Sequence, residues 1–223
     1  MRTLAACCVA LAAVPLSAAE PAKEMMGLPL AFHEDFAAGA QALRKFEFTD
    51  PKAWEIRQDA GRPVLALVAQ SKYEPKVRSP LNIAWVKGLK VGPFVMEVEL
   101  RSTTRDYNHR DLCLFFGGVD PEHFYYVHLG KKPDPNAHNV FIVNARPRRN
   151  IATKVDEGTP WTEKYHTARV VRKEGGEIEV YFDGKPAMTA KDDTFPAGRV
   201  GVGSFDDTGN FARITVWGRK AGE

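Results

Sequence analysis

The middle of the chain holds most of the residues that could carry out acid–base chemistry. Four of the six histidines lie between positions 109 and 138, among several aspartates and arginines. Histidine titrates near neutral pH, so it can act as a general base or as a metal ligand. The candidates for proton transfer are therefore His128, and His109 together with Asp111.

A second pattern that could support catalysis is a pair of carboxylates. Glycoside hydrolysis uses two carboxyl groups about 5–5.5 Å apart in retaining enzymes and about 6.5–9.5 Å apart in inverting enzymes. Glu97 and Glu99 lie two positions apart in a predicted strand, so they share a face at about 6.8 Å along the strand. The alternative is a charged outer face, in which each glutamate pairs with Arg101 or with a lysine of a neighbouring strand.

Aromatic and polar residues around these candidates could contact a sugar. In the predicted strand 124–129, Tyr126 and His128 share one face, where a ring could stack on a sugar and an imidazole could bind its hydroxyls. The alternative is an ordinary solvated sheet face. Trp161 lies in a predicted loop and could form an aromatic platform. The further candidates for substrate contacts are Lys131, His138, Asn144 and Arg146.

The same region is rich in cations, which would suit an acidic polysaccharide. Arginine can neutralise a uronate carboxylate while a tyrosine or histidine abstracts a proton in β-elimination. Loop arginines and lysines also serve simply as solubilising surface residues. The cationic candidates for this lyase chemistry are Arg105, Arg110, Lys131, Arg146 and Arg148.

Short strands must position all of these residues. From Leu30 onward, β-branched and aromatic runs alternate with Gly and Pro turn signals, and no long run has the 3.6-residue period of a helix. The clearest alternation of apolar and polar positions is in residues 94–101. The pattern predicts an all-β domain of two packed antiparallel sheets. Further strands are expected at 32–36, 79–85, 112–116, 124–129 and 139–144, and hairpin turns at 59–63 and 174–176.

The last third of the chain carries a recognisable pattern. A strand that ends in the Asp183-Gly184 turn is followed by a Gly-x-Val-Gly run within 198–207 and by a closing strand at 211–218. Together, these elements resemble the end of concanavalin A-like (laminin-G-like) jelly rolls. More narrowly, they resemble the secreted family known as 3-keto-disaccharide hydrolases or family 16 glycoside hydrolase-like domains. The resemblance covers roughly residues 30–219.

The resemblance implies a fold and a set of activities. It implies a two-sheet antiparallel jelly-roll sandwich in which the concave face of one sheet holds a glycan, together with hydrolysis of a glycosidic bond. Catalytic family 16 enzymes carry an E-x-D-x-x-E strand motif, which this sequence lacks. Three functions therefore remain open: a glycan-binding hydrolase, a non-catalytic lectin-like or adhesion module, and a polysaccharide lyase.

The resemblance also implies a structural calcium ion. Jelly rolls of this kind often hold Ca²⁺ between the opening and closing strands, and Asp35 and Asp207, with Asp206 beside it, are oxygen donors in corresponding places. The alternative for residues 206–210 is an Asx turn. No other cofactor is expected, since the sequence has neither an HExxH motif nor paired CxxC motifs.

The first residues predict the compartment. A positive charge at Arg2 precedes the apolar run 4–16, and small residues follow it, which fits a secretory signal peptide cleaved after Ala19. The protein is therefore expected to be secreted or periplasmic. The expected divisions of the chain are a signal peptide at 1–19, a flexible leader at 20–29 and one jelly-roll domain at 30–219.

Composition limits the partners. The net charge of +3 is too close to balance to favour nucleic acid, and beyond the signal no apolar run reaches the ~20 residues of a membrane span. Two of the three cysteines would leave with the signal peptide, so Cys113 would have no disulfide partner and is interpreted as an inert thiol. We expect a monomer that binds an oligo- or polysaccharide.

Overall fold

The protein consists of antiparallel strands joined by tight turns and short 3₁₀ helices. The computed structural model describes residues 20–222, so the predicted signal peptide at 1–19 lies outside the described residues. None of the helices in that range is long and apolar enough to span a membrane. The elements are β1 (Glu24–Met25), β2 (Leu28–Glu34), η1 (Gly39–Lys45), β3 (Phe46–Phe48), η2 (Pro51–Ala53), β4 (Trp54–Asp59), β5 (Arg62–Leu67), β6 (Asn82–Ser102), β7 (Cys113–Asp120), β8 (His123–His128), β9 (Asn139–Asn144), β10 (Arg149–Asn150), β11 (Ala152–Val155), β12 (His166–Arg172), η3 (Glu174–Gly176), β13 (Glu177–Phe182), β14 (Lys185–Lys191), β15 (Gly198–Ser204) and β16 (Gly209–Lys220).

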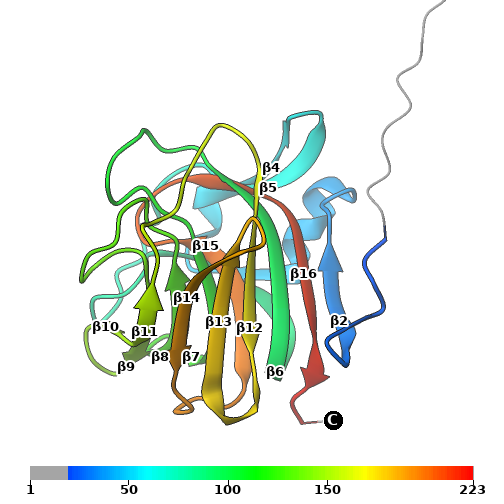
Figure 1. Ribbon diagram of the computed structural model, residues 1–223. Helices are drawn as coiled ribbons and strands as arrows, with labels where there is room; N and C mark the ends of the chain where they lie inside the picture. The colour runs from blue at the N-terminus through cyan, green and yellow to red at the C-terminus, as the bar shows by residue number, and fades with distance from the viewer. Residues whose placement is uncertain (1–19, 223) are drawn as a thin grey trace, which may run out of the picture.

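These strands form two packed sheets (Figure 1). The first sheet has the order β10-β9-β8-β7-β15-β6, and β3 pairs with the first half of β6. The second sheet has the order β11-β14-β13-β12-β6-β16, and β2 and β5 both pair with β16. The predicted fold class, an all-β antiparallel two-sheet sandwich, is confirmed.

Strand β6 belongs to both sheets. It is 21 residues long, with residues 82–91 paired with β15 and residues 94–100 paired with β12. The sequence predicted two separate strands, at 79–85 and 94–101, and the structure joins them into one. Gly88 has a φ of +71°, a left-handed conformation that bends the strand without ending it.

The predicted hairpins are present. Strands β4 and β5 pair around Ala60 and Gly61, which both have positive φ, as two-residue hairpin turns require. Strands β12 and β13 pair around residues 174–176. Strands β13 and β14 pair around Asp183 and Gly184, whose φ values are +47° and +75°. The Asp-Gly signal in the sequence therefore predicted its turn correctly.

The first and last long strands meet in the second sheet. Strand β2 pairs with β16, and His33 Nδ1 lies 3.0 Å from Thr215 Oγ1 across a separation of 182 residues. The segment 20–29 differs from the flexible leader that was expected. It contains β1, which pairs with β2, and the Ala22 carbonyl accepts a 2.7 Å hydrogen bond from Trp217 Nε1.

Alternating side chains fill the core between the sheets. On β6, Phe94, Met96 and Val98 are buried in this core, as are Tyr125 and Val127 on β8. The predicted alternation of residues 94–101 is therefore confirmed. The intervening residues of each strand must point to the outer faces of the sandwich.

The outer face of the first sheet carries a second apolar layer. Val77, from the segment between β5 and β6, and Phe205, after β15, pack against this layer. The face is therefore largely covered and is not the solvated surface that the sequence left open as an alternative. We call this set the outer aromatic layer: Ile83, Trp85, Cys113, Phe115, Phe124, Tyr126, Phe141 and Val143.

Candidate functional site

The outer aromatic layer is a continuous set of ring contacts across β6, β7, β8 and β9. The Trp85 and Phe115 ring centroids are 5.7 Å apart, and Tyr126 stacks on Phe141 at 5.1 Å with 15° between the planes. Because alternate residues of a strand share a face, His128 lies on the same side of β8 as Phe124 and Tyr126. Two recesses open on this face.

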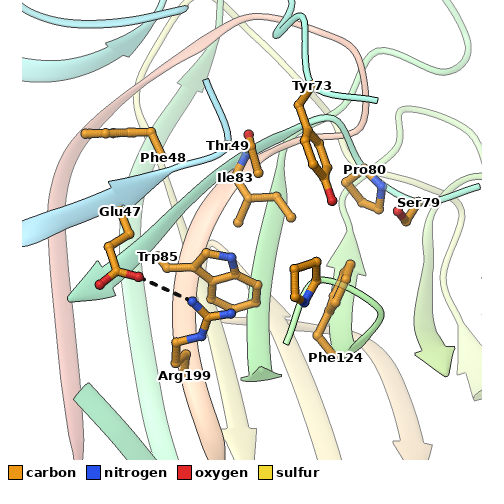
Figure 2. Close-up of a pocket in the computed structure, with 11 residues that line it drawn as sticks. Glu47, Phe48, Thr49, Tyr73, Ser79, Pro80, Ile83, Trp85, Phe124 and Arg199 are labelled. Carbon is orange, nitrogen blue, oxygen red and sulfur yellow. Dashed lines mark hydrogen bonds and ion pairs between the residues drawn. The ribbon is translucent and has the colours of Figure 1, made fainter. Parts of the chain in front are cut away.

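The apolar recess has a volume of about 210 Å³ and lies beside β3, β6 and β8 (Figure 2). Figure 2 shows the Trp85, Tyr73 and Phe124 rings around the opening, and Glu47 and Arg199 at its edge. The carboxylate of Glu47 lies 3.4 Å from Arg199 Nη1, and the guanidinium of Arg199 sits 4.7 Å from the centre of the Trp85 ring. The remaining lining residues are Phe48, Thr49, Ser79, Pro80, Ile83 and Pro121.

The polar recess is smaller, at about 110 Å³, and lies over the end of β8. Arg148 covers one side, with its guanidinium 4.1 Å from the centre of the Phe205 ring. His109 Nε2 lies 2.5 Å from Asp134 Oδ2, so His109 does not pair with Asp111 as expected. The lining residues are Arg78, Tyr107, His109, His128, Asn136, Arg148, Phe205 and Asp206.

A buried carboxylate lies beneath the polar recess. Asp111 is completely buried, and His128 Nε2 lies 3.2 Å from its Oδ2. Ser204 Oγ donates a 2.9 Å hydrogen bond to Asp111 Oδ1, and the Phe205 amide donates a 3.0 Å hydrogen bond to Oδ2. Cys113 Sγ lies 3.2 Å from the same Oδ2. The predicted pair of Asp111 with a histidine therefore exists, and the histidine is His128.

Asp207 supports this carboxylate from the other side. Its Oδ2 accepts hydrogen bonds from the Asp111 amide at 2.9 Å and from Tyr107 Oη at 2.8 Å. Its amide donates a 2.8 Å hydrogen bond to Ser204 Oγ. The predicted site residues Asp111 and Asp207 are thus hydrogen-bonded to each other at the end of the first sheet, and His128 contacts Asp111 at 3.2 Å.

Burial and mutual repulsion separate the pKa values of these aspartates. Burial would raise the pKa of Asp111, but the charge of His128 and the donors around the carboxylate lower it below its usual value. Burial, followed by the charge of Asp111, raises the pKa of Asp207 to about 7. The same two causes raise the pKa of Asp206. The cluster therefore combines an ionised carboxylate with carboxyl groups that hold a proton more tightly.

Tyr126 does not present a free ring for sugar stacking, which corrects that prediction. Its ring is completely buried between Phe115 and Phe141. Its hydroxyl accepts a 2.7 Å hydrogen bond from Arg148 Nη1. The shared face of Tyr126 and His128 was predicted correctly, but the covering residues close it over Tyr126.

Glu97 and Glu99 are not part of this site, which corrects their assignment as a catalytic pair. They lie on the outer face of the second sheet, because the intervening Val98 points into the core. Glu97 lies 2.6 Å from Arg169, and Glu99 lies 2.5 Å from Arg62. The alternative of a charged outer face is therefore the one that the structure supports, although the partners are Arg169 and Arg62 and not Arg101 or a lysine.

Trp161 is not an exposed platform, which corrects a third prediction. It is 8% exposed, and its Nε1 donates hydrogen bonds to the carbonyls of Arg110 at 3.1 Å and Leu129 at 3.0 Å. It also packs edge-on against Phe182. Although Trp161 lies in a loop, the loop folds its indole into the core.

The other predicted contact residues are dispersed. His138 is buried, with Nε2 2.5 Å from Asp156 Oδ1. Lys131 donates to Asp106. Asn144 and Arg146 are exposed at and after the end of β9. Within residues 20–222, none of these four side chains lines the apolar or the polar recess.

The calcium-site prediction is only partly reflected in the geometry. Asp207 and Asp206 share a cluster with Asp111, in which one oxygen from each lies within 4.8 Å of the others. Asp35 belongs to no such group among residues 20–222, and its Oδ1 accepts a 3.0 Å hydrogen bond from the Ala37 amide. A calcium ion that joins Asp35 to Asp207 stays a prediction.

Several residues of the two recesses were not among the candidates predicted from the sequence. Tyr73 and Arg78 come from the segment between β5 and β6, which contains no regular strand and gave no signal of a position over the sheet. Phe124 could have been found, because it lies two residues before Tyr126 in the same predicted strand and therefore shares its face. Cys113 lies two residues after Asp111 and is paired directly opposite His128 on the neighbouring strand, so it lies beside two predicted site residues.

Comparison with known proteins identifies the fold. No protein-family model and no curated protein matches this sequence. The chain is similar to the carbohydrate-binding module CBM66 from Bacillus subtilis, with a TM-score of 0.56 and 15% identity over 78% of this chain and 95% of that one. It is also similar to a protein with a galectin-like fold from Bacillus subtilis, with a TM-score of 0.58 and 12% identity over 85% of this chain and 96% of that one.

A third similar structure contains a bound sugar. It is domain 4 of AbnA, a GH43 extracellular arabinanase from Geobacillus stearothermophilus, in complex with arabinotriose. The TM-score is 0.56, with 9% identity over 86% of this chain and 93% of that one. At such identities, these matches show the fold, which is a galectin-like or concanavalin A-like sandwich.

Proposed function

We propose that the protein binds carbohydrate in the apolar recess. A sugar ring has apolar C–H faces and a polar rim of hydroxyls. The ring of Tyr73, which is partly exposed, supplies surface for the first, above a floor formed by the largely buried rings of Trp85 and Phe124. Glu47 and Arg199 supply acceptors and donors for the second. The volume of about 210 Å³ has room for one sugar ring.

Two solved structures of the same fold support this proposal. One is named as a carbohydrate-binding module, and another holds arabinotriose. The observation that carries the proposal is nevertheless the recess itself, in which three aromatic rings and an ion pair converge on one opening. Sites for small ligands commonly combine a mostly apolar wall with a few placed polar groups.

A glycan array followed by calorimetry on the best ligand tests the proposal. The change Tyr73→Ala should weaken binding about tenfold, because one aromatic contact contributes roughly 0.5–1.5 kcal/mol beyond its buried area. Tyr181→Ala is the matched control, since Tyr181 is a half-buried tyrosine on the second sheet and should leave affinity unchanged. An array without a bound glycan, or equal affinity in both variants, would contradict the proposal.

Hydrolysis of a glycosidic bond at the polar recess is the second candidate function. The observation that favours it is the position of Asp206, which lines the recess together with His109 and His128. Burial and the charge of Asp111 raise the pKa of Asp206, as a general acid requires. The family resemblance makes 3-keto disaccharides the first substrates to try.

Product analysis distinguishes the possible reactions. The protein is incubated with neutral, acidic and 3-keto glycans, and products are followed by mass spectrometry. A split substrate that has gained water supports hydrolysis, and Asp206→Asn should then reduce turnover by roughly a hundredfold, the usual effect of removing one acid–base group. An unsaturated product without added water supports the lyase alternative. Saturable glycan binding without any product supports the alternative of a non-catalytic, lectin-like module.

We also propose that the protein is exported and acts as a monomer. The signal-peptide pattern supports export, and protein purified from its source should then begin at Glu20. An N-terminal sequence that begins at Met1 would contradict this. Light scattering tests the monomeric state.

A further inference from the structure

The side chain of His128 is oriented in a way that the glycan proposal does not use. Its Nδ1 lies 3.1 Å from the carbonyl oxygen of Asn136. A carbonyl only accepts hydrogen bonds, so Nδ1 carries the proton and, in the neutral imidazole, Nε2 carries a lone pair. A histidine whose Nδ1–H is held by a backbone carbonyl is the arrangement found around metal-ligating Nε2 atoms.

The Nε2 atom of His128 has no hydrogen-bond partner among residues 20–222, although the side chain is 4% exposed. It lies 3.2 Å from Asp111 Oδ2, but a proton on Nε2 would not be aligned with that oxygen. In the neutral imidazole, a lone pair on Nε2 would therefore face a carboxylate oxygen that is also an acceptor. A cation that both atoms can approach would relieve this repulsion.

Cys113 completes a set of three donors around this point. Strands β7 and β8 place Cys113 and His128 directly opposite each other in register, and Asp111 shares the face of Cys113. One donor atom from each of the three residues lies within 4.8 Å of the other two, and all three residues are buried. The Asp111 Oδ2 atom lies 3.2 Å from both Sγ and Nε2.

These separations fit a tetrahedral transition metal. Zinc bonds of about 2.0 Å to oxygen, 2.0–2.1 Å to nitrogen and 2.3 Å to sulfur place neighbouring ligand atoms roughly 3.3–3.6 Å apart. Two of the three edges are thus within a few tenths of an ångström of that spacing. Thiolate and imidazole ligands favour zinc over calcium, which takes six to eight oxygens.

We propose that Asp111, Cys113 and His128 form a binding site for a borderline-soft divalent cation, with Zn²⁺ preferred. Water or a ligand atom would take the fourth coordination position, and His128 also lines the polar recess. The inference goes beyond the proposed glycan binding and does not rest on it, because the apolar recess uses none of these three residues.

Cobalt spectroscopy tests the site, because Co²⁺ replaces zinc and a thiolate bonded to it absorbs in the near ultraviolet. The full chain is used in a C7S/C8S background, so that Cys113 is the only thiol. After treatment with a chelator, Co²⁺ should bind at one equivalent with a thiolate-to-cobalt band and intense visible bands of a four-coordinate ion. Zn²⁺ should displace it and raise the thermal midpoint of unfolding.

Variants assign the ligands. Cys113→Ser should remove the near-ultraviolet band, and His128→Gln should weaken binding at least about tenfold. His123→Gln is the matched control, since His123 pairs with Asp120 at the surface and should change neither property. Circular dichroism shows whether each variant is folded.

Either of two results would overturn the proposal. The first is the absence of a thiolate-to-cobalt band in the folded C7S/C8S protein, which decides the matter even where the ligand variants do not fold. The second is cobalt affinity in folded Cys113→Ser and His128→Gln that equals the affinity of the control.

Discussion

The outer faces of the two sheets follow the same alternation but differ in how far apolar side chains cover them. The second sheet has two smaller buried clusters on this face, one with Val64 and Ala212 and one with Val95 and Trp217. On the second sheet, Glu97 and Arg169 pair across neighbouring strands within a partly exposed polar surface. On the first sheet, Trp85, Phe115 and Tyr126 occupy the corresponding positions and are covered. Covering a face removes water, so any polar group left there must be partnered or functional. The difference points to the first sheet as the functional face.

The largest expected effect is the loss of a ring from the outer aromatic layer. Phe115 is completely buried and contacts Trp85, Phe124 and Tyr126. Phe115→Ala should therefore lower the free energy of unfolding by about 3–5 kcal/mol, as in the core of a protein. Urea unfolding measures this loss. A loss below about 1 kcal/mol would show that the layer is not packed as a second core.

A smaller loss is expected at the buried carboxylate of the first sheet. Asp111→Asn keeps the shape but replaces one acceptor oxygen by an amide, which leaves donors such as the Phe205 amide or Ser204 Oγ without their acceptor. An orphaned buried donor costs about 1–3 kcal/mol. Unfolding is measured in the presence of a chelator. A variant as stable as the parent would mean that the cluster is more hydrated than the structure shows.

A pH-dependent effect is expected from buried His138. Burial lowers the pKa of His138 below its ordinary value of 6.5, although Asp156 opposes this. The unfolded chain then takes up a proton that the folded chain does not, so this contribution is fully present above pH 6.5 and is lost as the pH falls. The slope is at most about 1.4 kcal/mol per pH unit.

His138→Asn is the variant that isolates this effect. Asparagine tolerates the φ of +48° at this position and does not titrate in this range. The free energy of unfolding, measured by urea between about pH 7.5 and pH 5, should fall less steeply in the variant than in the parent. Some slope should persist, because burial also lowers the pKa of His33. Parallel curves would contradict the assignment to His138.

The smallest expected effect is on the second sheet. A double-mutant cycle of Glu97→Gln and Arg169→Ala should give a coupling energy below about 1 kcal/mol, because both side chains are partly exposed and water screens the pair. Added salt should reduce the coupling further. A coupling energy above about 2 kcal/mol would show that the pair is shielded from water, so the outer face of the second sheet would not differ from the covered face of the first.

The parts of the fold that depend on local pattern could be predicted from the sequence. The two-residue period fixed which side chains of residues 94–101 are buried, and it correctly placed Tyr126 and His128 on one face. The Asp183-Gly184 turn was predicted because positive φ values restrict the residues that can occupy it. Such features are determined by neighbours in the chain.

The parts that depend on distant segments could not be predicted. Nothing near Tyr126 in the sequence shows that Arg148 and Phe141 enclose it. Trp161 follows turn-forming residues, yet two carbonyls from other segments hold its indole in the core. The same limit applies to Cys113. It was interpreted as an inert thiol from its apolar neighbours in the same strand, which do not reveal that His128 lies opposite it on β8.

The pairing of β2 with β16 has a consequence for the order in which the molecule can form. Because His33 contacts Thr215 across 182 residues, β2 cannot pair with β16 until those residues have been synthesised. Until then the apolar residues of β2 lack their native contacts with β16, so a chaperone that binds the growing chain would bind it before the second sheet is complete.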